Sequence, residues 1–363
     1  MQSNCLMQDE SISAELHSLK VVAVGGGTGL SMVLQGLKQY VMPSEQLLQG
    51  AAPTIAELSA IVTVSDDGGS SGRLRRELNV PAPGDVRNCI VALSEDEALL
   101  SRLFRYRFPP GEGLGGHNFG NLFLSAMTAI TGDFSQAVKH SSAILATRGH
   151  IYPATTSNAQ LYAIMDDGSV VRGETNITAS QHRIVELHME PADAAPLPMA
   201  LEAIESADLI TIGPGSLFTS LAPNLLVRGV ANAMANSHAV KVFVCNLMTQ
   251  ANESLGLTAA DHISALYKHA GRGFFDYALV NRTSASPELA LKYAEQQQSQ
   301  VEADVDRIEA LGVKPILGEY LVEAVDPKEG LIARHDTHQV AQDLLRLMME
   351  LRESPLTALR RER

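Results

Sequence analysis

Apolar runs that end in glycine-rich or polar loops recur along the chain and predict a repeating unit of strand, loop and helix. Lys20–Val24 is followed by glycines and then by apolar residues at positions 30, 33, 34 and 37, the spacing of a helix face. Leu58–Val64 has the pattern of a second buried strand. After residue 206, the runs ADLITI, AVKVFVC and FDYALV repeat this arrangement. The alternation predicts an α/β fold with a Rossmann-like, doubly wound and mostly parallel sheet.

Three segments depart from this alternation of strand, loop and helix. Residues 84–148 show helical periodicity throughout, which predicts a helical insertion. Residues 150–190 contain short apolar runs on either side of Asp167-Gly168, a strong hairpin signal, and predict a small antiparallel β element. Residues 282–311 are polar and helical in pattern. We expect one domain over residues 20–350, between a flexible tail at 1–19 and a frayed tail at 351–363.

Composition narrows the class of protein. The formal charge of -13 over 363 residues argues against a general nucleic-acid binder, which needs a basic face. Cys5, Cys89 and Cys245 lack zinc-site spacing and are odd in number, so reduced thiols are expected. The first residues lack the basic start and apolar core of a signal peptide, and no apolar run is long enough for a membrane span. These features predict a cytoplasmic protein.

Positive charge is concentrated in one segment of this acidic chain. Seven arginines are grouped there: Arg73, Arg75, Arg76, Arg87, Arg102, Arg105 and Arg107. They indicate either a local site for a small anion or solvated helix faces, and the sequence favours neither for any single arginine.

The first glycine loop, VVAVGGGTGLS, fits the dinucleotide fingerprint only in part. Gly25 and Gly27 match G-x-G-x-x-G, but Leu30 stands at the third glycine and the acid follows after about forty residues instead of about twenty. No Gly-Lys-Ser/Thr follows, so this is not a P-loop. Glycines before a helix still let backbone N–H groups approach an anion, which favours a phosphate. The alternative is a tight turn without a ligand.

Further polar loops follow other predicted strands. Gly213–Ser216 (GPGS) opens a helix after one strand, TVSDDGGSSG follows another, and NLMTQ a third. Ligands of open α/β sheets bind at the carboxyl ends of the strands, where the strand order reverses. Four polar loops at that edge predict a common cleft.

Several side chains are candidates for chemistry. Asp66 or Asp67 beside a diphosphate would hold Mg²⁺ or act as a general base, although an Asx turn explains the pair equally well. His117, in GLGGHNFGNL, indicates either the edge of a site or a helix-capping turn. His335 and His338 suggest a metal only weakly, and we expect them on the surface.

The motifs VVAVGGGTGLS, TVSDDGGSSGRLR, PGDVRNCIVAL, GHNFGNLFL, ADLITIGPGSLFTSLAPNLL and VFVCNLMTQ together resemble the gluconeogenesis-factor proteins of the YvcK type, within the CofD-like superfamily. The resemblance covers about residues 20–350. It implies a bacterial cytoplasmic protein with a Rossmann-like fold, associated with growth on gluconeogenic carbon sources and with cell shape. Some relatives bind UDP-sugars such as UDP-N-acetylglucosamine, and the related enzyme CofD transfers a phospholactyl group from a guanosine diphosphate derivative to a deazaflavin.

The motifs and the resemblance together give the candidate ligand-binding residues, with Asp66 and Asp67 beside the phosphates. These candidates are Gly25, Gly26, Gly27, Thr28, Gly29, Gly68, Gly69, Ser70, Arg87, Asn88, His117, Asn121, Gly213, Pro214, Gly215, Ser216 and Asn246. The chain departs from the relatives at His150, where an arginine is expected, and at QANES, which replaces a Gly-Glu-Thr ending. GDVRNC and DDGGSSG also differ from the transferase's motifs, so its activity is not carried over.

Two hypotheses follow. The first is a regulatory protein that binds a UDP-sugar and links carbon supply to envelope synthesis through protein partners. The second is a CofD-like transferase that acts on a nucleotide diphosphate ester, with Asp66 or Asp67 and Mg²⁺. A nicotinamide dehydrogenase is a distant third, and a homo-oligomer is left open.

Overall fold

The computed structural model describes residues 18–42, 54–95 and 98–353. The expected tails at 1–19 and 351–363 lie outside the described residues, except where β1 (Ser18–Gly25) and α15 (Thr337–Glu353) extend into them. Within the described ranges, no helix combines the length and the apolar character needed to cross a bilayer.

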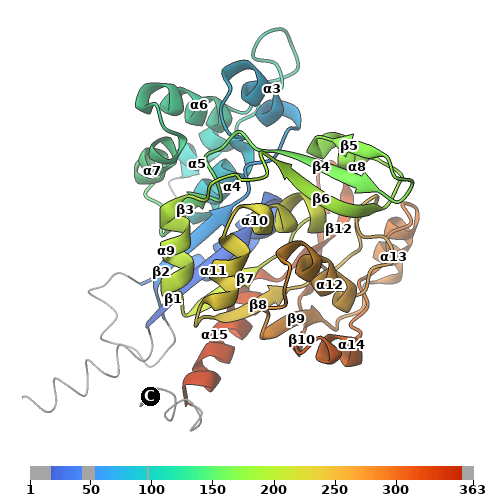
Figure 1. Ribbon diagram of the computed structural model, residues 1–363. Coiled ribbons are helices and arrows are strands. Elements are labelled where there is room, and N and C mark those ends of the chain that lie inside the picture. The colour runs from blue at the N-terminus through green and yellow to red at the C-terminus, as the bar shows by residue number, and fades with distance from the viewer. Residues whose placement is uncertain (1–17, 43–53, 96–97, 354–363) are drawn as a thin grey trace, which may run out of the picture.

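A parallel sheet of seven strands forms the centre of the molecule (Figure 1). Its strands are, in spatial order, β10 (Lys314–Gly318), β9 (Tyr277–Asn281), β8 (Val240–Val244), β7 (Leu209–Ile212), β1, β2 (Thr54–Val62) and β3 (His150–Pro153). The chain adds strands from β1 to β3 in one direction, then returns to β7 beside β1 and adds strands to β10 in the other. This doubly wound order confirms the predicted fold class and places the reversal between β1 and β7.

Both faces of the sheet are buried because successive side chains of a strand point to opposite faces. Along β1, Val22 and Val24 join one apolar core, while Val21 and Ala23 join the other. The first core is covered by α9 (Pro198–Ser206), the π-helix η1 (Leu217–Leu221), α10 (Ala222–Leu226), α11 (Val230–Asn236), α12 (Ala259–Ala270) and α14 (Val305–Ala310). The second is covered by α2 (Gly27–Lys38), α4 (Gly84–Leu93), α5 (Ala98–Arg105), α6 (Phe119–Thr131), α7 (Phe134–Ile144), α13 (Pro287–Ala294) and α15.

The helical insertion at 84–148 is confirmed, since α4 to α7 occupy it. An additional helix precedes it: α3 (Gly69–Leu78) begins within the glycine-serine segment after Asp67, with Gly72 donating to the Gly68 carbonyl. That segment is therefore the first turn of a helix, whereas sequence analysis took it for a polar loop.

The small β element is also present, with a shifted start. β4 (Gln160–Met165) pairs antiparallel with β5 (Val170–Arg172) and β6 (Ile184–Glu190), and the turn at Gly168 confirms the predicted hairpin. A short helix, α8 (Glu174–Ala179), lies between β5 and β6. The prediction was wrong for residues 150–153, because β3 pairs parallel with β2 and forms an edge of the main sheet.

The C-terminal third differs most from the expectation. The single helical pattern over 282–311 is interrupted after α13, where the chain turns and Gln300 bridges to Met248. Three strands were not predicted: β10, and the antiparallel pair β11 (Leu321–Asp326) and β12 (Gly330–His335). Apolar and polar residues alternate only weakly along β11 and β12, because this hairpin is only partly buried against the rest of the protein.

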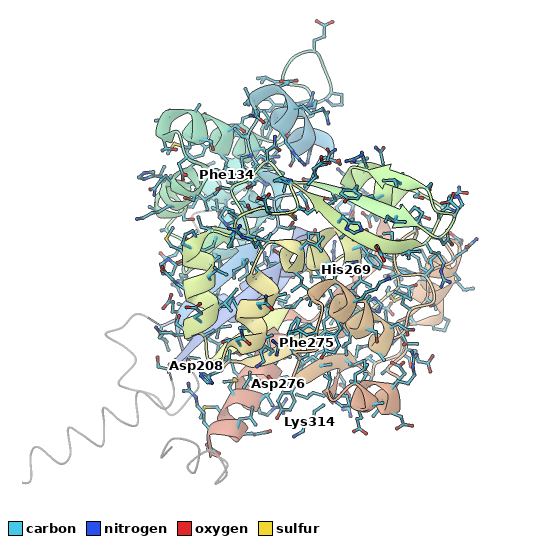
Figure 2. All side chains as sticks on the ribbon, in the orientation of Figure 1. Phe134, Asp208, His269, Phe275, Asp276 and Lys314 are labelled. Atoms are coloured by element: carbon cyan, nitrogen blue, oxygen red, sulfur yellow. The ribbon has the colours of Figure 1, made fainter. Side chains whose placement is uncertain are left out.

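Acidic side chains hold the amino ends of the strands. Asp208 accepts from the Lys20 N–H at 2.8 Å and from the Arg352 guanidinium, while Asp276 accepts from the Lys241 N–H at 2.8 Å (Figure 2). These contacts tie neighbouring strands together at the amino edge of the sheet, opposite the carboxyl edge.

The contact of α2 with α15 gives a stability test. A methyl group at Gly36 would lie 2.2 Å from the Thr337 carbonyl oxygen. We expect Gly36→Ala to lower the free energy of unfolding by about 1–3 kcal/mol in urea titrations, although alanine favours helices by about 1 kcal/mol. Gly111→Ala is the control, since its methyl group meets nothing within 4 Å. Equal stability of Gly36→Ala and the native chain would contradict the close contact.

Candidate functional site

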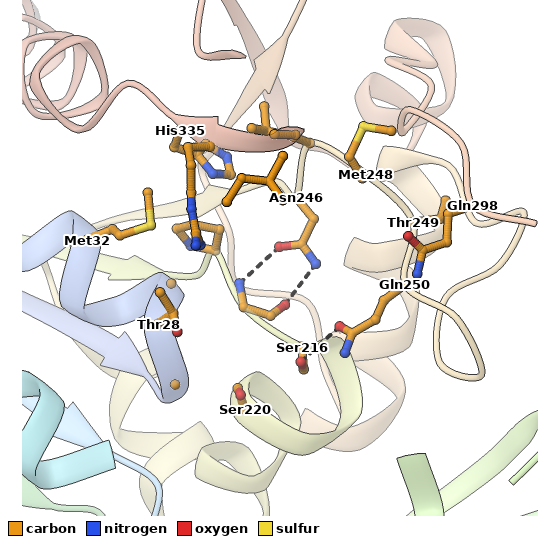
Figure 3. A pocket seen from close by; sticks show the side chains of 18 of the residues that line it. Thr28, Met32, Ser216, Ser220, Asn246, Met248, Thr249, Gln250, Gln298 and His335 are labelled. Carbon is orange, nitrogen blue, oxygen red and sulfur yellow. Dashed lines mark hydrogen bonds between the residues drawn. The ribbon is translucent and has the colours of Figure 1, made fainter. Parts of the chain in front are cut away.

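A cavity of about 800 Å³ lies at the carboxyl edge of the sheet, at the reversal of strand order (Figure 3). One wall is formed by the loops after β1, β7 and β8, and the opposite wall by α13, the turn after it and β12. The first wall comes from loops of the predicted cleft. The second comes from the segment predicted to be polar and helical, 282–311, and from β12, which was not predicted.

The glycine loop after β1 places the first amides of α2 at the cavity. α2 begins at Gly27, within the glycine run, with no side-chain cap and no acidic residue in its first turn. The first N–H groups of a helix lack internal partners and carry the positive end of the helix dipole. Gly26, Gly27, Thr28 and Gly29 line the cavity. This end of α2 is therefore suited to an anion.

The two glycine loops touch each other. A Cβ at Gly29 would lie 2.1 Å from the Pro214 carbonyl oxygen, so only glycine lets α2 start this close to the loop after β7. Pro214, Gly215 and Ser216 line the cavity beside the first loop. The close approach places two strand-end loops around one ligand position.

Asn246 holds the second loop. Following β8, its Oδ1 accepts from the Gly215 N–H at 2.9 Å and its Nδ2 donates to the Gly215 carbonyl at 2.8 Å, as the dashed lines in Figure 3 show. The Ser216 hydroxyl donates to Gln250 Oε1 at 2.8 Å. Side chains from the next loop therefore set the conformation of the glycine loop.

The QANES segment supports η1, the helix that follows this loop. Glu253 is 8% exposed and accepts from the Phe218 N–H at 3.3 Å and the Thr219 hydroxyl at 3.0 Å. Burial raises the pKa of Glu253 above its usual range, and these donors oppose that rise. The departure from the Gly-Glu-Thr pattern therefore lies against the site, whereas His150 lies on β3, stacked on Tyr152 and outside the cavity lining.

Two carboxyls that sequence analysis did not select line the cavity, Asp85 on α4 and Glu174 on α8. Burial, then the charge of Asp66, raises the pKa of Asp85 to about 7, while the Gly27 N–H that it accepts lowers it. Burial, then Asp66 and Asp85, raises the pKa of Glu174 well above its usual range. The GDVRNC motif contains Asp85 and could have identified it from the sequence. No sequence motif marks Glu174.

Asp66 and Asp67 lie behind this lining. Asp66 Oδ1 accepts from the Gly68 N–H at 2.8 Å, the Asx-turn contact, and Asp67 Oδ1 accepts from the Thr175 N–H at 2.9 Å and its hydroxyl at 2.6 Å. Asp67 thus binds α8 to the main domain, and Asp66 acts on the cavity through its charge.

The other candidates outside the cavity lining are Gly25, Gly68, Gly69, Ser70, Arg87, Asn88, His117, Asn121 and Gly213. Gly25 ends β1 and Gly213 follows β7 directly. The Ser70 hydroxyl lies 3.1 Å from His117 Nδ1, and Asn121 donates to the Ser71 hydroxyl at 3.4 Å. His117 and Asn121 therefore support the start of α3.

The expectation for His335 was wrong. His335 lines the cavity, and its Nε2 donates to the Cys245 carbonyl at 3.0 Å. Burial lowers the pKa of His335 to about 4, so the ring is neutral at physiological pH. The reason is the unpredicted β12, which carries the end of the hairpin over the sheet. His338 is exposed, as expected.

The second wall is rich in polar groups that sequence analysis missed. Tyr293, Gln296 and Gln298 come from α13 and the turn after it, and Arg334 comes from β12. Lys292 donates to the Glu329 and Leu331 carbonyls, which fastens α13 to the hairpin. No local motif marks these residues, since long-range pairing alone brings them to the site.

Strand order and glycine loops at the reversal define a Rossmann-like α/β protein of the doubly wound class. The chain belongs to the CofD family: the family model described as 2-phospho-L-lactate transferase CofD matches residues 21–321.

Within that family, the similar curated proteins are gluconeogenesis factors. The chain is 45% identical to the gluconeogenesis factor of Halalkalibacterium halodurans, over 90% of this chain and 95% of that protein. It is 44% identical to the gluconeogenesis factor of Bacillus subtilis, over 91% and 98% of the two chains. A crystal structure of a Bacillus halodurans protein has a TM-score of 0.83 and 44% identity, covering 90% of this chain and 99% of that one.

The carboxyl group of Asp85 predicts a pH-dependent stability. Its pKa is near 7 when folded and about 3.8 ordinarily, so the folded state binds more protons between these values. Stability due to Asp85 therefore falls as pH rises through this window. We expect Asp85→Asn to leave stability unchanged near pH 4 and to raise it by about 4 kcal/mol near pH 8 in urea titrations.

Asp133→Asn is the contrasting control. Asp133 caps α7, and hydrogen bonds from the Ser135 hydroxyl and the Gln136 N–H lower its pKa, so this change should reduce stability at neutral pH and have no effect in acid. Identical pH profiles for Asp85→Asn and the native chain would contradict the desolvated carboxyl.

Proposed function

We propose that this protein is a cytoplasmic regulatory factor that binds a nucleotide sugar of the UDP-N-acetylglucosamine type in the 800 Å³ cavity. In this role it links carbon supply to envelope synthesis and cell shape through protein partners. The observation that carries the proposal is the contact of two glycine loops at the strand-order reversal, with the first residues of α2 lining the cavity.

The amide-lined end is where the diphosphate would lie. Backbone N–H groups and a helix N-terminus bind phosphate without a lysine. Asp85 already accepts the Gly27 N–H there, so a diphosphate competes with this carboxyl unless the carboxyl is protonated or a cation lies between them. Binding should therefore respond to pH and to divalent cations.

The remaining cavity suits the neutral parts of the ligand. Four carboxamides line it, Asn246, Gln250, Gln296 and Gln298. Asn246 and Gln250 hold the glycine loop, and Gln296 and Gln298 offer donors and an acceptor for sugar hydroxyls or a base edge. Met32 and Ile332 add apolar surface. The volume lies within the range of about 300–1,000 Å³ typical of small-molecule sites.

The direct test is calorimetric titration with UDP-N-acetylglucosamine, and with UDP, GDP and NADH for comparison. We expect saturable one-site binding of the UDP-sugar. Asn246→Ala should weaken it about tenfold, because Gly215 loses both contacts that orient its loop. Asn232→Ala, an exposed site on α11, should bind as the native chain does. Absence of heat with every UDP-sugar would refute the proposal.

A second function is favoured by the carboxyls at the phosphate end, namely a CofD-like transferase acting on a nucleotide diphosphate ester. Mg²⁺ is commonly held by one or two carboxylates plus substrate phosphates, and Asp85 and Glu174 line the cavity in that way, with Asp66 adding charge. Among the described residues, the three-ligand cluster found is Asp166, Asp167 and His182, outside this lining. The site fits Mg²⁺ only together with ligand phosphates.

The transferase reading predicts turnover of a donor that Asp66→Asn abolishes while nucleotide binding persists. A screen of nucleotide diphosphate esters with and without Mg²⁺, analysed by mass spectrometry, measures this. Asp67→Asn is informative as well, since Asp67 fastens α8 and its loss should weaken binding first. If the native protein binds donors and converts none of them, the transferase function is refuted and only the regulatory function remains.

A further inference from the structure

A second, smaller cavity adjoins the first. This side cleft, of about 370 Å³, lies between α2, α4, the end of α5 and β12. Its lining residues are Thr28, Ser31, Met32, Gln35, Asn88, Val91, Arg105 and Arg334. It shares Thr28, Met32 and Arg334 with the nucleotide cavity, so the side chains of α2 form the partition between the two.

Two arginines line the side cleft, Arg105 and Arg334, and the charge of Arg334 acts on Asp326. Neither the Arg105 nor the Arg334 side chain makes an ion pair or hydrogen bond within the described part of the chain. Arg107 lies nearby, with its guanidinium on the Gly116 carbonyl. In a chain of net charge -13, two cations that line one concave surface and form no direct ion pair are unexpected for a surface that only meets water.

Several positive charges lie close together beside the side cleft. The pKa of Arg87 is lowered to about 10, first by burial and then by Arg107, and Arg105 adds to this effect. Asp85 and Asp66 offset Arg87 on the nucleotide side. Asp85 is on α4 and lines the nucleotide cavity, whereas Arg105 lines the side cleft.

We propose that the side cleft is a second anion-binding site, which holds a carboxylate or phosphate group of a small acid between Arg105 and Arg334. A guanidinium fork binds both groups in bidentate fashion, and Asn88 and Thr28 offer additional hydrogen-bonding groups. For a separate acid, the site does not depend on the proposed nucleotide function; for an acid carried by the nucleotide, it rests on that function. The acid is either a separate small molecule or a group carried by the nucleotide ligand around Met32.

The test compares Arg105→Gln with Arg102→Gln. Both are exposed arginines of α5, and Arg102 does not line the side cleft. Citrate and inorganic phosphate, titrated calorimetrically, probe a separate acid. UDP-glucuronate and UDP-glucose, which differ by one carboxylate in place of a hydroxymethyl group, probe an acid attached to the nucleotide.

For a separate acid, we expect Arg105→Gln to weaken citrate or phosphate binding about tenfold and Arg102→Gln to leave it unchanged. For an attached acid, UDP-glucuronate should bind about tenfold more tightly than UDP-glucose, and Arg105→Gln should remove that preference. Either result supports the site. The proposal is overturned if no probe binds, or if Arg105→Gln and the native chain bind all four alike. Failure of UDP-glucose alone bears on the nucleotide function and not on this cleft.

Discussion

The contact between Gly29 and the Pro214 carbonyl is the constraint on which the site depends. Strand order reverses between β1 and β7, so the helices that follow these neighbouring strands leave toward opposite faces of the sheet. Their first turns meet only at the carboxyl edge, and a side chain at position 29 would separate them. Asn246 then holds the second loop from the next strand. The loops after three neighbouring strands, β1, β7 and β8, therefore define one ligand position together. No single loop defines it.

Electrostatically, the site combines opposed tendencies. Helix amides and the α2 dipole attract an anion, while Asp85, Glu174 and Asp66 repel it. Burial without neutralising partners raises the pKa values of Asp85 and Glu174, so part of the repulsion is relieved by protons. A nucleotide in this cavity would reduce the repulsion further, either by bringing a cation or by favouring the protonated carboxyls. Such a balance suits reversible binding more than permanent occupancy.

The sequence predicted the half of the site that is local. Each strand end followed by glycines, Gly25–Gly29 and Gly213–Ser216, is recognisable because turn chemistry and helix starts are encoded within a few residues. Asp85 was missed within a motif that had been noticed, since its proximity to Gly27 arises from the packing of α4 on α2. His335 was misplaced because its strand, β12, has weak alternation and pairs only with β11. Long-range contacts therefore account for the missing wall.

The second cavity wall includes a strand of the β11–β12 hairpin, and this affects how the protein would respond to a ligand. A two-stranded hairpin has little stability by itself, and β11–β12 is held in place by α13, through Lys292, and by the His335 contact to Cys245. A ligand that touches both the glycine loops and β12 adds contacts between the sheet and this hairpin, and so favours one position of it. On the proposed function, the position of the hairpin then depends on occupancy. The exposed Val322 and Val325 belong to β11, and because side chains alternate along a strand they lie on its two opposite faces. The ligand would therefore act on the β11–β12 hairpin and not on the strands of the central sheet.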